Sequence, residues 1–328
     1  MGKLLVIGTG AMGFNHARVC AEIGSLVGVC DLNEESAKRV GGKFGVPWYT
    51  NFTTALVESG AEGAIIATPT SSHEQIASEA MKLGIDVLVE KPIAGTLEEV
   101  DRMMKIAEEK ELVLAVGHVE RYNPVIGYAK ERLLSGEWGE TVAISSRRVS
   151  NLPTRIRDVG VILDLGIHDI DNAIHLMGSK PISVFARGGK INEIKFEDHA
   201  TLAIGFENGR NAIVEVNWIT PMKVRKLSLT CEESFIELDY INQQVKISSS
   251  IFVEEGESGF PASIEFDEKL IPMARQEPLK LEILSFINAM GGESRGIVDG
   301  KQARDALQVA LCAMESLSSG EVVNLDGK

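Results

Sequence analysis

Short apolar runs alternate with longer amphipathic segments over the first third of the chain. Each run is nearly continuous in apolar residues, which is typical of strands in a parallel sheet buried on both faces. The segments between the runs are long enough for helices. The runs comprise residues 4–7, 26–30, 64–67, 87–89 and 112–116. The pattern predicts an α/β domain with a doubly wound parallel sheet.

The regular alternation of predicted strands and helices ends after Gly117. Asn208-Gly209 lies between two apolar runs and favours a type I′ hairpin turn. The expected helices begin near Pro124 and cover residues 161–177, 279–290 and 301–318. The expected strands comprise residues 142–146, 199–206, 211–218, 226–230, 235–239 and 245–248. This half is predicted to be an α+β domain built on a largely antiparallel open sheet.

The length of 328 residues exceeds the size at which one hydrophobic core usually stops growing, so two domains are expected. We place residues 1–119 in the first domain and residues 120–328 in the second, where the regular alternation ends.

The net charge of −14, from 47 acidic and 33 basic residues, disfavours nucleic-acid and membrane-surface partners. The start of the chain resembles neither a signal peptide nor a membrane span. The four cysteines are scattered without zinc-site spacing and indicate reduced thiols. We therefore expect a cytoplasmic protein without a metal site.

A glycine-rich motif, Gly8-Thr9-Gly10-Ala11-Met12-Gly13, follows the first apolar run directly and opens a predicted helix. The first two glycines allow a tight turn close to a pyrophosphate, and the third allows close helix–strand packing. The string alone is also compatible with a flexible turn. Asp31 strengthens the dinucleotide interpretation, because it ends the second run 18 residues after Gly13. An acid near this position hydrogen-bonds the ribose of NAD and repels the additional phosphate of NADP. We expect NAD as the cofactor.

Two further strand ends fall at the carboxyl edge of the predicted sheet, where open α/β folds bind ligands. They carry Thr68 and Pro69, with His73 nearby, and then Glu90 and Lys91. We assign all five to the cofactor site, although each is also compatible with turn or surface chemistry. Lys91 additionally suits the anchoring of a substrate hydroxyl.

Asp164, His168, Asp171 and His175 recur at helical spacing and would share one face of a regular helix. Oxidation of a secondary alcohol needs a base for the hydroxyl proton, and histidine suits this task near neutral pH. His168 is the candidate base, and Asp164 would orient it. A divalent metal site or a structural polar face are the alternatives.

These motifs together resemble the Gfo/Idh/MocA family of oxidoreductases. The resemblance is carried by the glycine motif, Glu90-Lys91-Pro92, residues 117–124, residues 164–171 and Glu277-Pro278-Leu279. It implies that Lys91, Asp164 and His168 form the catalytic group and that a hydride passes between NAD and a sugar or cyclitol carbon. It also implies homodimers or homotetramers formed through the second domain's sheet.

Within the family, residues 117–124 and 155–158 look most like UDP-N-acetylglucosamine 3-dehydrogenases. The expected substrate is a nucleotide sugar oxidised at C3. A free aldose or cyclitol dehydrogenase, a glycosidase with transient C3 oxidation and a non-catalytic NAD-sensing module are the alternatives. The predicted substrate-binding residues are Arg121, Tyr122, Asn123, Arg157 and Asp158. Arg148 and Arg155 are further candidates to neutralise a diphosphate.

Overall fold

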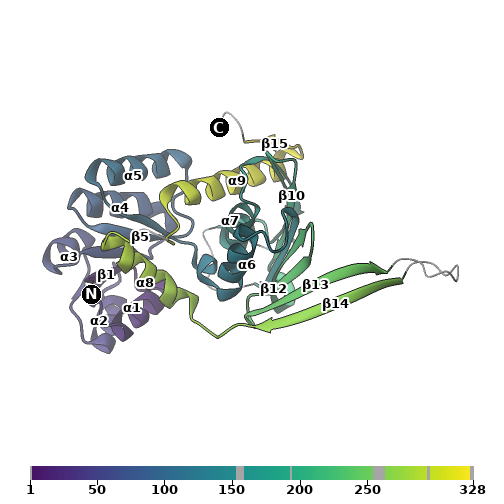
Figure 1. Cartoon of the computed structure of the whole chain (residues 1–328). Coiled ribbons are helices and arrows are strands. Elements are labelled where there is room, and N and C mark those ends of the chain that lie inside the picture. Colours follow the sequence, from purple (N-terminus) through teal and green to yellow (C-terminus); the bar gives the residue numbers. More distant parts are fainter. Residues whose placement is uncertain (1, 153–158, 193, 254–262, 294–295, 326–328) are drawn as a thin grey trace. The chain divides into compact units, whose positions relative to one another are not determined.

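The computed structural model describes residues 2–152, 159–192, 194–253, 263–293 and 296–325. The chain forms two compact units (Figure 1). The first comprises residues 1–122 and 277–308, and the second comprises residues 123–276 and 309–328. The chain therefore crosses between units near the boundary expected at residue 119, and it also returns to the first unit. In the described residues, no helix combines the length and apolar character that crossing a membrane requires.

The first unit is built on a parallel sheet with the strand order β3-β2-β1-β4-β5-β6, which is the order of dinucleotide-binding folds. Its strands are β1 (Leu4–Ile7), β2 (Leu26–Cys30), β3 (Trp48–Tyr49), β4 (Gly63–Ile66), β5 (Asp86–Glu90) and β6 (Leu114–Gly117). Its helices are α1 (Ala11–Glu22), α2 (Glu34–Phe44), α3 (Phe52–Glu58), α4 (His73–Lys82), α5 (Leu97–Lys110) and α8 (Pro278–Met290), with the 3₁₀ turns η1 (Thr70–Ser72) and η2 (Val119–Tyr122). The predicted doubly wound fold is confirmed.

The return of the chain to the first unit follows from the apolar face of α8. Leu279, Ile283 and Phe286 are buried in one cluster with Leu4 and Val19. Removing these large side chains from water stabilises the contact between α8 and α1. The sequence pattern identified the helix but not the unit to which it belongs.

The second unit is built on a mixed sheet with the order β14-β13-β12-β11-β7-β10-β9-β8-β15. The β7–β10 pair is parallel and the other pairs are antiparallel, which confirms the largely antiparallel prediction. The strands are β7 (Thr141–Asn151), β8 (Pro181–Gly189), β9 (His199–Phe206), β10 (Asn211–Asn217), β11 (Ile219–Cys231), β12 (Phe235–Asp239), β13 (Gln244–Val253), β14 (Ser263–Pro272) and β15 (Val323–Asn324). Strands β13 and β14 form a long hairpin (Figure 1).

Helices cover one face of this sheet. They are α6 (Pro124–Leu134), α7 (Ile167–Met177) after the π-helical turn η3 (Ile162–Gly166), and the second part of α9 (Gly300–Ser319). The side chains of β10 alternate between a buried and an exposed face of the sheet. Ala212, Val214 and Val216 are buried, whereas Ile213 is 38% exposed. Such alternation is typical of a sheet with one packed face.

The hairpin between β9 and β10 differs from the predicted type I′ turn. A type I′ turn requires a positive φ at both central residues. Gly209 has a φ of +78°, but the φ of Asn208 is not positive. The Gly209 amide donates to the Phe206 carbonyl at 2.9 Å, and the Phe206 amide donates to Arg210. The loop is a turn followed by a glycine bulge, so the dipeptide located the hairpin correctly but not its geometry.

Candidate active site

The glycine-rich turn between β1 and α1 has two positions that only glycine fits. Gly8 has a φ of +91°, and a Cβ atom there would lie 2.4 Å from the carbonyl oxygen of Ala67. A Cβ atom at Gly13 would lie 1.7 Å from the carbonyl oxygen of Gly8. The helix therefore packs directly on the turn, as the motif predicted.

Gly10 leaves the N-terminus of α1 open. It is the N-cap residue and has no side chain with which to cap the helix, and a Cβ atom there would meet nothing within 4 Å. The first turn, which begins Ala11-Met12-Gly13, contains no acidic residue. Free amides and the helix dipole together fit an anion such as a pyrophosphate.

Asp31 is held in place at the end of β2 by the glycine-rich turn itself. Its Oδ2 atom accepts hydrogen bonds from the Thr9 amide at 2.7 Å and the Thr9 hydroxyl at 2.9 Å. Its Oδ1 atom accepts one from the Asn33 amide at 2.8 Å. The carboxylate is thus fixed beside the open N-terminus of α1, where the ribose interaction was predicted.

Replacing Asp31 with alanine is expected to weaken NAD⁺ binding by about 10- to 100-fold, the value of a hydrogen bond to a charged group. The same change should reduce discrimination against NADP⁺, because the carboxylate no longer repels the extra phosphate. Titration of both cofactors by calorimetry measures the two effects. Glu34→Ala, in the first turn of α2, is the control. Equal losses for both cofactors would contradict the assigned role.

The segment after β4 buries the ring of His73. His73 is 1% exposed, and its Nδ1 and Nε2 atoms lie 3.0 Å from the Pro92 carbonyl oxygen and 2.9 Å from the Thr68 carbonyl oxygen. Burial lowers the pKa of His73, against the smaller opposing effect of these contacts. Both ring nitrogens of His73 therefore lie against backbone carbonyl oxygens, and its place beside a nicotinamide stays a prediction. Thr68 is half-buried, with its hydroxyl accepting from Ser72 at 2.8 Å, and Pro69 is exposed.

The strand end after β5 places the carboxylate of Glu90 inside the first unit. Glu90 is 7% exposed, its Oε1 atom lies 2.8 Å from His16 Nε2, and its Oε2 atom accepts from the Lys91 amide at 3.1 Å. Both oxygens are engaged inside the unit, and the assignment of Glu90 to the cofactor site stays a prediction. Lys91 itself is half-buried and precedes Pro92 through a cis peptide bond.

Glu282 on α8 is a buried acid that the sequence pattern did not single out. It is fully buried, and neither oxygen has a hydrogen-bond partner within the described residues. Burial, followed by the negative charge of Glu90, raises the pKa of Glu282 well above 4.5. Burial also raises the pKa of Tyr122. Glu282 is therefore a neutral carboxylic acid beside an ionised one.

The raised pKa of Glu282 makes stability fall as pH rises. In the unfolded chain this group loses its proton above about pH 4.5, whereas the folded protein retains it until its higher pKa is reached. Glutamine at position 282 does not titrate, so Glu282→Gln removes this loss of a proton on unfolding. In urea unfolding experiments, we expect the free energy of unfolding of the variant to rise relative to that of the wild type between pH 5 and pH 8. A difference between the two proteins that does not change with pH would contradict the assignment.

In the second unit, Asp164 and His168 lie at a break in the helix. Residues 162–166 form a π-helical turn, and α7 begins at Ile167. The regular helix on which the four-residue polar stripe was based is therefore interrupted, and Asp171 is 1% exposed whereas Asp164, His168 and His175 are half-buried. π-turns are frequent at functional sites. The prediction of one uniform polar face was wrong.

A distant carboxylate caps this helical segment. Glu197 Oε1 accepts from the Ile162 amide at 3.1 Å, and the Glu197 carbonyl accepts from the Val161 amide at 3.1 Å. A Cβ atom at Gly160 would lie 2.0 Å from the Glu197 carboxylate, so a larger residue there would displace the capping group. Glu197 lies 35 residues from Ile162, and no local pattern indicates the contact.

Arg148 lies inside the second unit, so it is not available to the diphosphate for which the sequence made it a candidate. It is 1% exposed and donates through Nε to Asp169 Oδ2 at 2.5 Å. Its guanidinium lies 5.2 Å from the ring centroid of Tyr240, whose hydroxyl accepts from Asn172 at 3.1 Å. Arg148 shares the inward face of β7 with Ile144, an alternation that could have placed it inside.

Comparison with known proteins connects these two units to one family. A model described as the oxidoreductase family with an NAD-binding Rossmann fold matches residues 3–118, and the C-terminal domain model of the same family matches residues 126–237. The UDP-N-acetylglucosamine 3-dehydrogenase of Acidithiobacillus ferrooxidans is 30% identical over 93% of this chain and 94% of its own length. The chain belongs to the Gfo/Idh/MocA family. It is an oxidoreductase with an NAD-binding Rossmann domain.

Other members of the Gfo/Idh/MocA family resemble the chain over its whole length. The scyllo-inositol 2-dehydrogenase (NAD(+)) of Bacillus subtilis is 28% identical over 99% of this chain and 97% of its own. A solved structure of the Acidithiobacillus ferrooxidans enzyme superposes with a TM-score of 0.87 at 29% identity, covering 97% of this chain and 98% of that one. The family prediction made from the motifs is confirmed.

The residues predicted to bind substrate differ from one another in burial and in the groups that they contact. Arg121 is half-buried in η2, and Tyr122 lies beside Ser285 and Glu282 of α8. Asn123 is 3% exposed, caps α6 through the Val125 amide and donates to the Tyr240 carbonyl at 3.1 Å, which is a structural role. Arg155, Arg157 and Asp158 lie outside the described residues.

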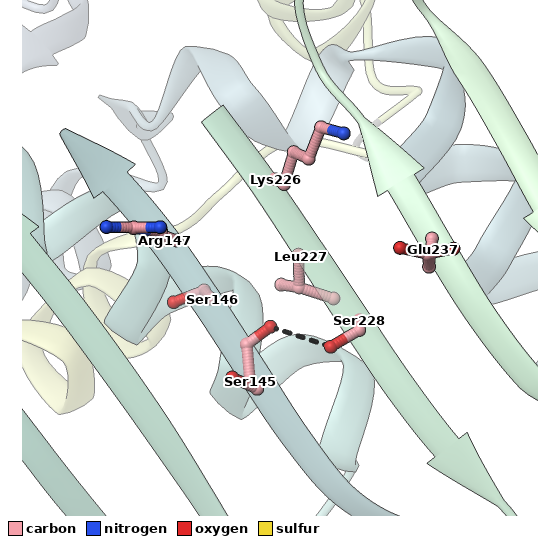
Figure 2. Close-up of a pocket in the computed structure, with 7 residues that line it drawn as sticks. All are labelled: Ser145, Ser146, Arg147, Lys226, Leu227, Ser228 and Glu237. Atoms are coloured by element: carbon pink, nitrogen blue, oxygen red, sulfur yellow. Dashed lines mark hydrogen bonds between the residues drawn. The ribbon is translucent and has the colours of Figure 1, made fainter. Parts of the chain in front are cut away.

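A small polar pocket opens on the sheet of the second unit (Figure 2). Strands β7, β11 and β12 form it, and the Ser228 hydroxyl donates to the Ser145 carbonyl at 3.3 Å. It is lined by Ser145, Ser146, Arg147, Lys226, Leu227, Ser228 and Glu237. None of the described residues predicted to bind cofactor or substrate lines it.

Proposed function

We propose that the chain oxidises a secondary alcohol of a nucleotide sugar, with C3 of UDP-N-acetylglucosamine as the preferred position. The main support is the 30% identity to a UDP-N-acetylglucosamine 3-dehydrogenase over 93% of the chain. Asp164 and His168 at the π-turn, and Lys91 after β5, are the residues that would carry the chemistry. NAD held at the N-terminus of α1 would supply the hydride acceptor.

Each of the three side chains has one role in this proposal. The imidazole of His168 accepts the hydroxyl proton while the carbon–hydrogen bond breaks and its electron pair leaves as hydride. Asp164, at the preceding turn, orients the imidazole and stabilises its protonated form. The ammonium of Lys91 donates a hydrogen bond to the substrate oxygen. Each role follows from the chemistry of the side chain and from the family resemblance.

The proposal is tested by mixing the purified protein with NAD⁺ and UDP-N-acetylglucosamine and following the absorbance of reduced nicotinamide. We expect turnover with this substrate and little with the sugar lacking its nucleotide. Mass spectrometry of the product should show the loss of two hydrogen atoms. No reduction of NAD⁺ with any nucleotide sugar would overturn the proposal.

A free cyclitol is the second candidate substrate, and the 28% identity to the scyllo-inositol dehydrogenase favours it. Faster NAD⁺ reduction with scyllo-inositol than with the nucleotide sugar would select it. Release of the group attached to the sugar without net reduction of NAD⁺ would indicate the glycosidase chemistry instead.

Assembly and location complete the proposal. We infer a homodimer or homotetramer formed through the uncovered face of the second unit's sheet, where Arg147, Lys226, Ser228 and Glu237 surround the pocket (Figure 2). Light scattering on the wild type and on Lys226→Glu would measure the assembly.

All four cysteines are free and buried, which supports a reducing, cytoplasmic location.

A further inference from the structure

Two buried histidines flank the backbone that carries Lys91, and the roles proposed above use neither of them. His16 comes from α1, the helix that opens at the glycine-rich turn, and it is fully buried. His73 begins α4 and is 1% exposed. Since a buried polar side chain is costly unless it is hydrogen-bonded, the partners of these two rings indicate their purpose.

His16 acts on Lys91 through Glu90. The ring Nε2 atom lies 2.8 Å from Glu90 Oε1, and Glu90 Oε2 accepts from the Lys91 amide at 3.1 Å. Gly117 on β6 makes room for this carboxylate, because a Cβ atom there would lie 3.2 Å from Glu90 Oε2. One carboxylate thus joins the pyrophosphate-binding helix to the residue that follows β5.

His73 holds the other side of the same segment. Its Nδ1 atom lies 3.0 Å from the carbonyl oxygen of Pro92, and its Nε2 atom lies 2.9 Å from the carbonyl oxygen of Thr68. The ring therefore lies between the strand ends after β4 and β5, and in its neutral form it donates to one of these two carbonyl oxygens. Lys91 lies between the contact at its own amide and the contact at the next carbonyl.

The groups around Glu90 favour the ionised form of its carboxylate, which accepts a hydrogen bond from the Lys91 amide. Burial alone would raise the pKa of Glu90, but the hydrogen bond from His16 and the charges of His16 and Lys91 outweigh it and lower the pKa. Glu282, the other buried carboxyl beside it, stays protonated. Glu90 is therefore the ionised member of the pair, and its charge faces His16 and Lys91.

We propose that His16 and His73 are positioning residues that form a clamp on Lys91, acting through the Glu90 carboxylate and the Pro92 carbonyl. This inference rests on the proposed function, in which Lys91 contacts the substrate oxygen. The clamp ties the reactive lysine to the two turns that would hold the cofactor. Losing it displaces Lys91, and a displacement of about 1 Å is enough to cost about 100-fold in rate.

The test compares His16→Leu, which removes the ring nitrogen, with His16→Gln, which retains an N–H donor. Single-turnover formation of NADH from UDP-N-acetylglucosamine should fall about 10- to 100-fold in His16→Leu and recover largely in His16→Gln. In a Lys91→Ala background, His16→Leu should cost less than about 2-fold, because the group it positions is gone. Equal losses in both backgrounds would mean that His16 is merely structural and would overturn the clamp.

A second readout needs neither cofactor nor turnover. Carbon-13 NMR of the glutamate carboxyl groups in NAD-free protein, assigned with Glu90→Gln, follows the ionisation of Glu90. We expect Glu90 to stay ionised below its usual range in the wild type and to gain its proton at higher pH in His16→Leu. An unchanged Glu90 titration would overturn the clamp even if the protein oxidises nucleotide sugars. An altered titration without any turnover would support the clamp and refute the proposed function.

Discussion

Replacing His168 with alanine is expected to lower the rate of NAD⁺ reduction by about 10²- to 10⁴-fold, the usual contribution of a general base. The affinity for NAD⁺ should not change, because the cofactor-binding turn lies in the other unit. Single-turnover kinetics and calorimetric titration measure the two quantities separately. The loss should also shrink at high pH, where hydroxide substitutes for the missing base.

His175→Ala is the matched control for His168→Ala. It lies on the same helix, seven positions further along, and is likewise half-buried. We expect its rate to stay within about 3-fold of the wild type, since the proposed reaction does not use it. Similar losses in both variants would assign the effect to the helix, and an undiminished rate in His168→Ala would refute the role of His168.

Replacing Asp169 with alanine is expected to destabilise the second unit by about 3–5 kcal/mol, because it leaves the buried guanidinium of Arg148 without its carboxylate. Trp138 and Trp218, each 2% exposed in this unit, report its unfolding by fluorescence in urea. Replacing Arg148 and Asp169 together with apolar residues of similar volume should recover much of the loss. A double variant as unstable as Asp169→Ala would contradict this account.

The neighbouring strand position offers a control with the same chemistry. Arg147 and Glu215 form an ion pair at 3.1 Å on the same strand, β7, and its partner β10, but their side chains are 56% and 38% exposed. In the dissociated subunit, Glu215→Ala should cost less than about 1 kcal/mol, because water solvates both charges there. The contrast between the two pairs isolates burial as the cause.

Features set by short spacing were predictable from the sequence. Gly8, Gly13 and Asp31 lie where the motif placed them, because a strand, a tight turn and a helix N-terminus are encoded within about 25 residues. The strand at residues 26–30 was predicted with its observed bounds. A continuous apolar run is a local property, and burial on both faces requires it.

Features set by distant partners were not predictable. The contact between Glu90 and His16 joins residues 74 positions apart on different elements, so no local pattern indicates it. Asp164 and His168 were identified by type and spacing, whereas the π-turn between them depends on the Glu197 cap from a later strand connection. Strand β14 was not predicted; it is an edge strand, and its side chains at 267–270 are exposed, so no buried face marks them in the sequence.

Transfer of the hydrogen atom from C3 of the sugar to NAD⁺ is the step on which the whole account depends. It is measured by incubating the protein with NAD⁺ and UDP-N-acetylglucosamine deuterated at C3, and by analysing the nicotinamide and the sugar by mass spectrometry. We predict deuterium on the reduced nicotinamide, a slower single-turnover rate than with the unlabelled sugar, and neither result in His168→Ala. Reduced nicotinamide without deuterium, or no reduction at all with the wild type, would contradict the account.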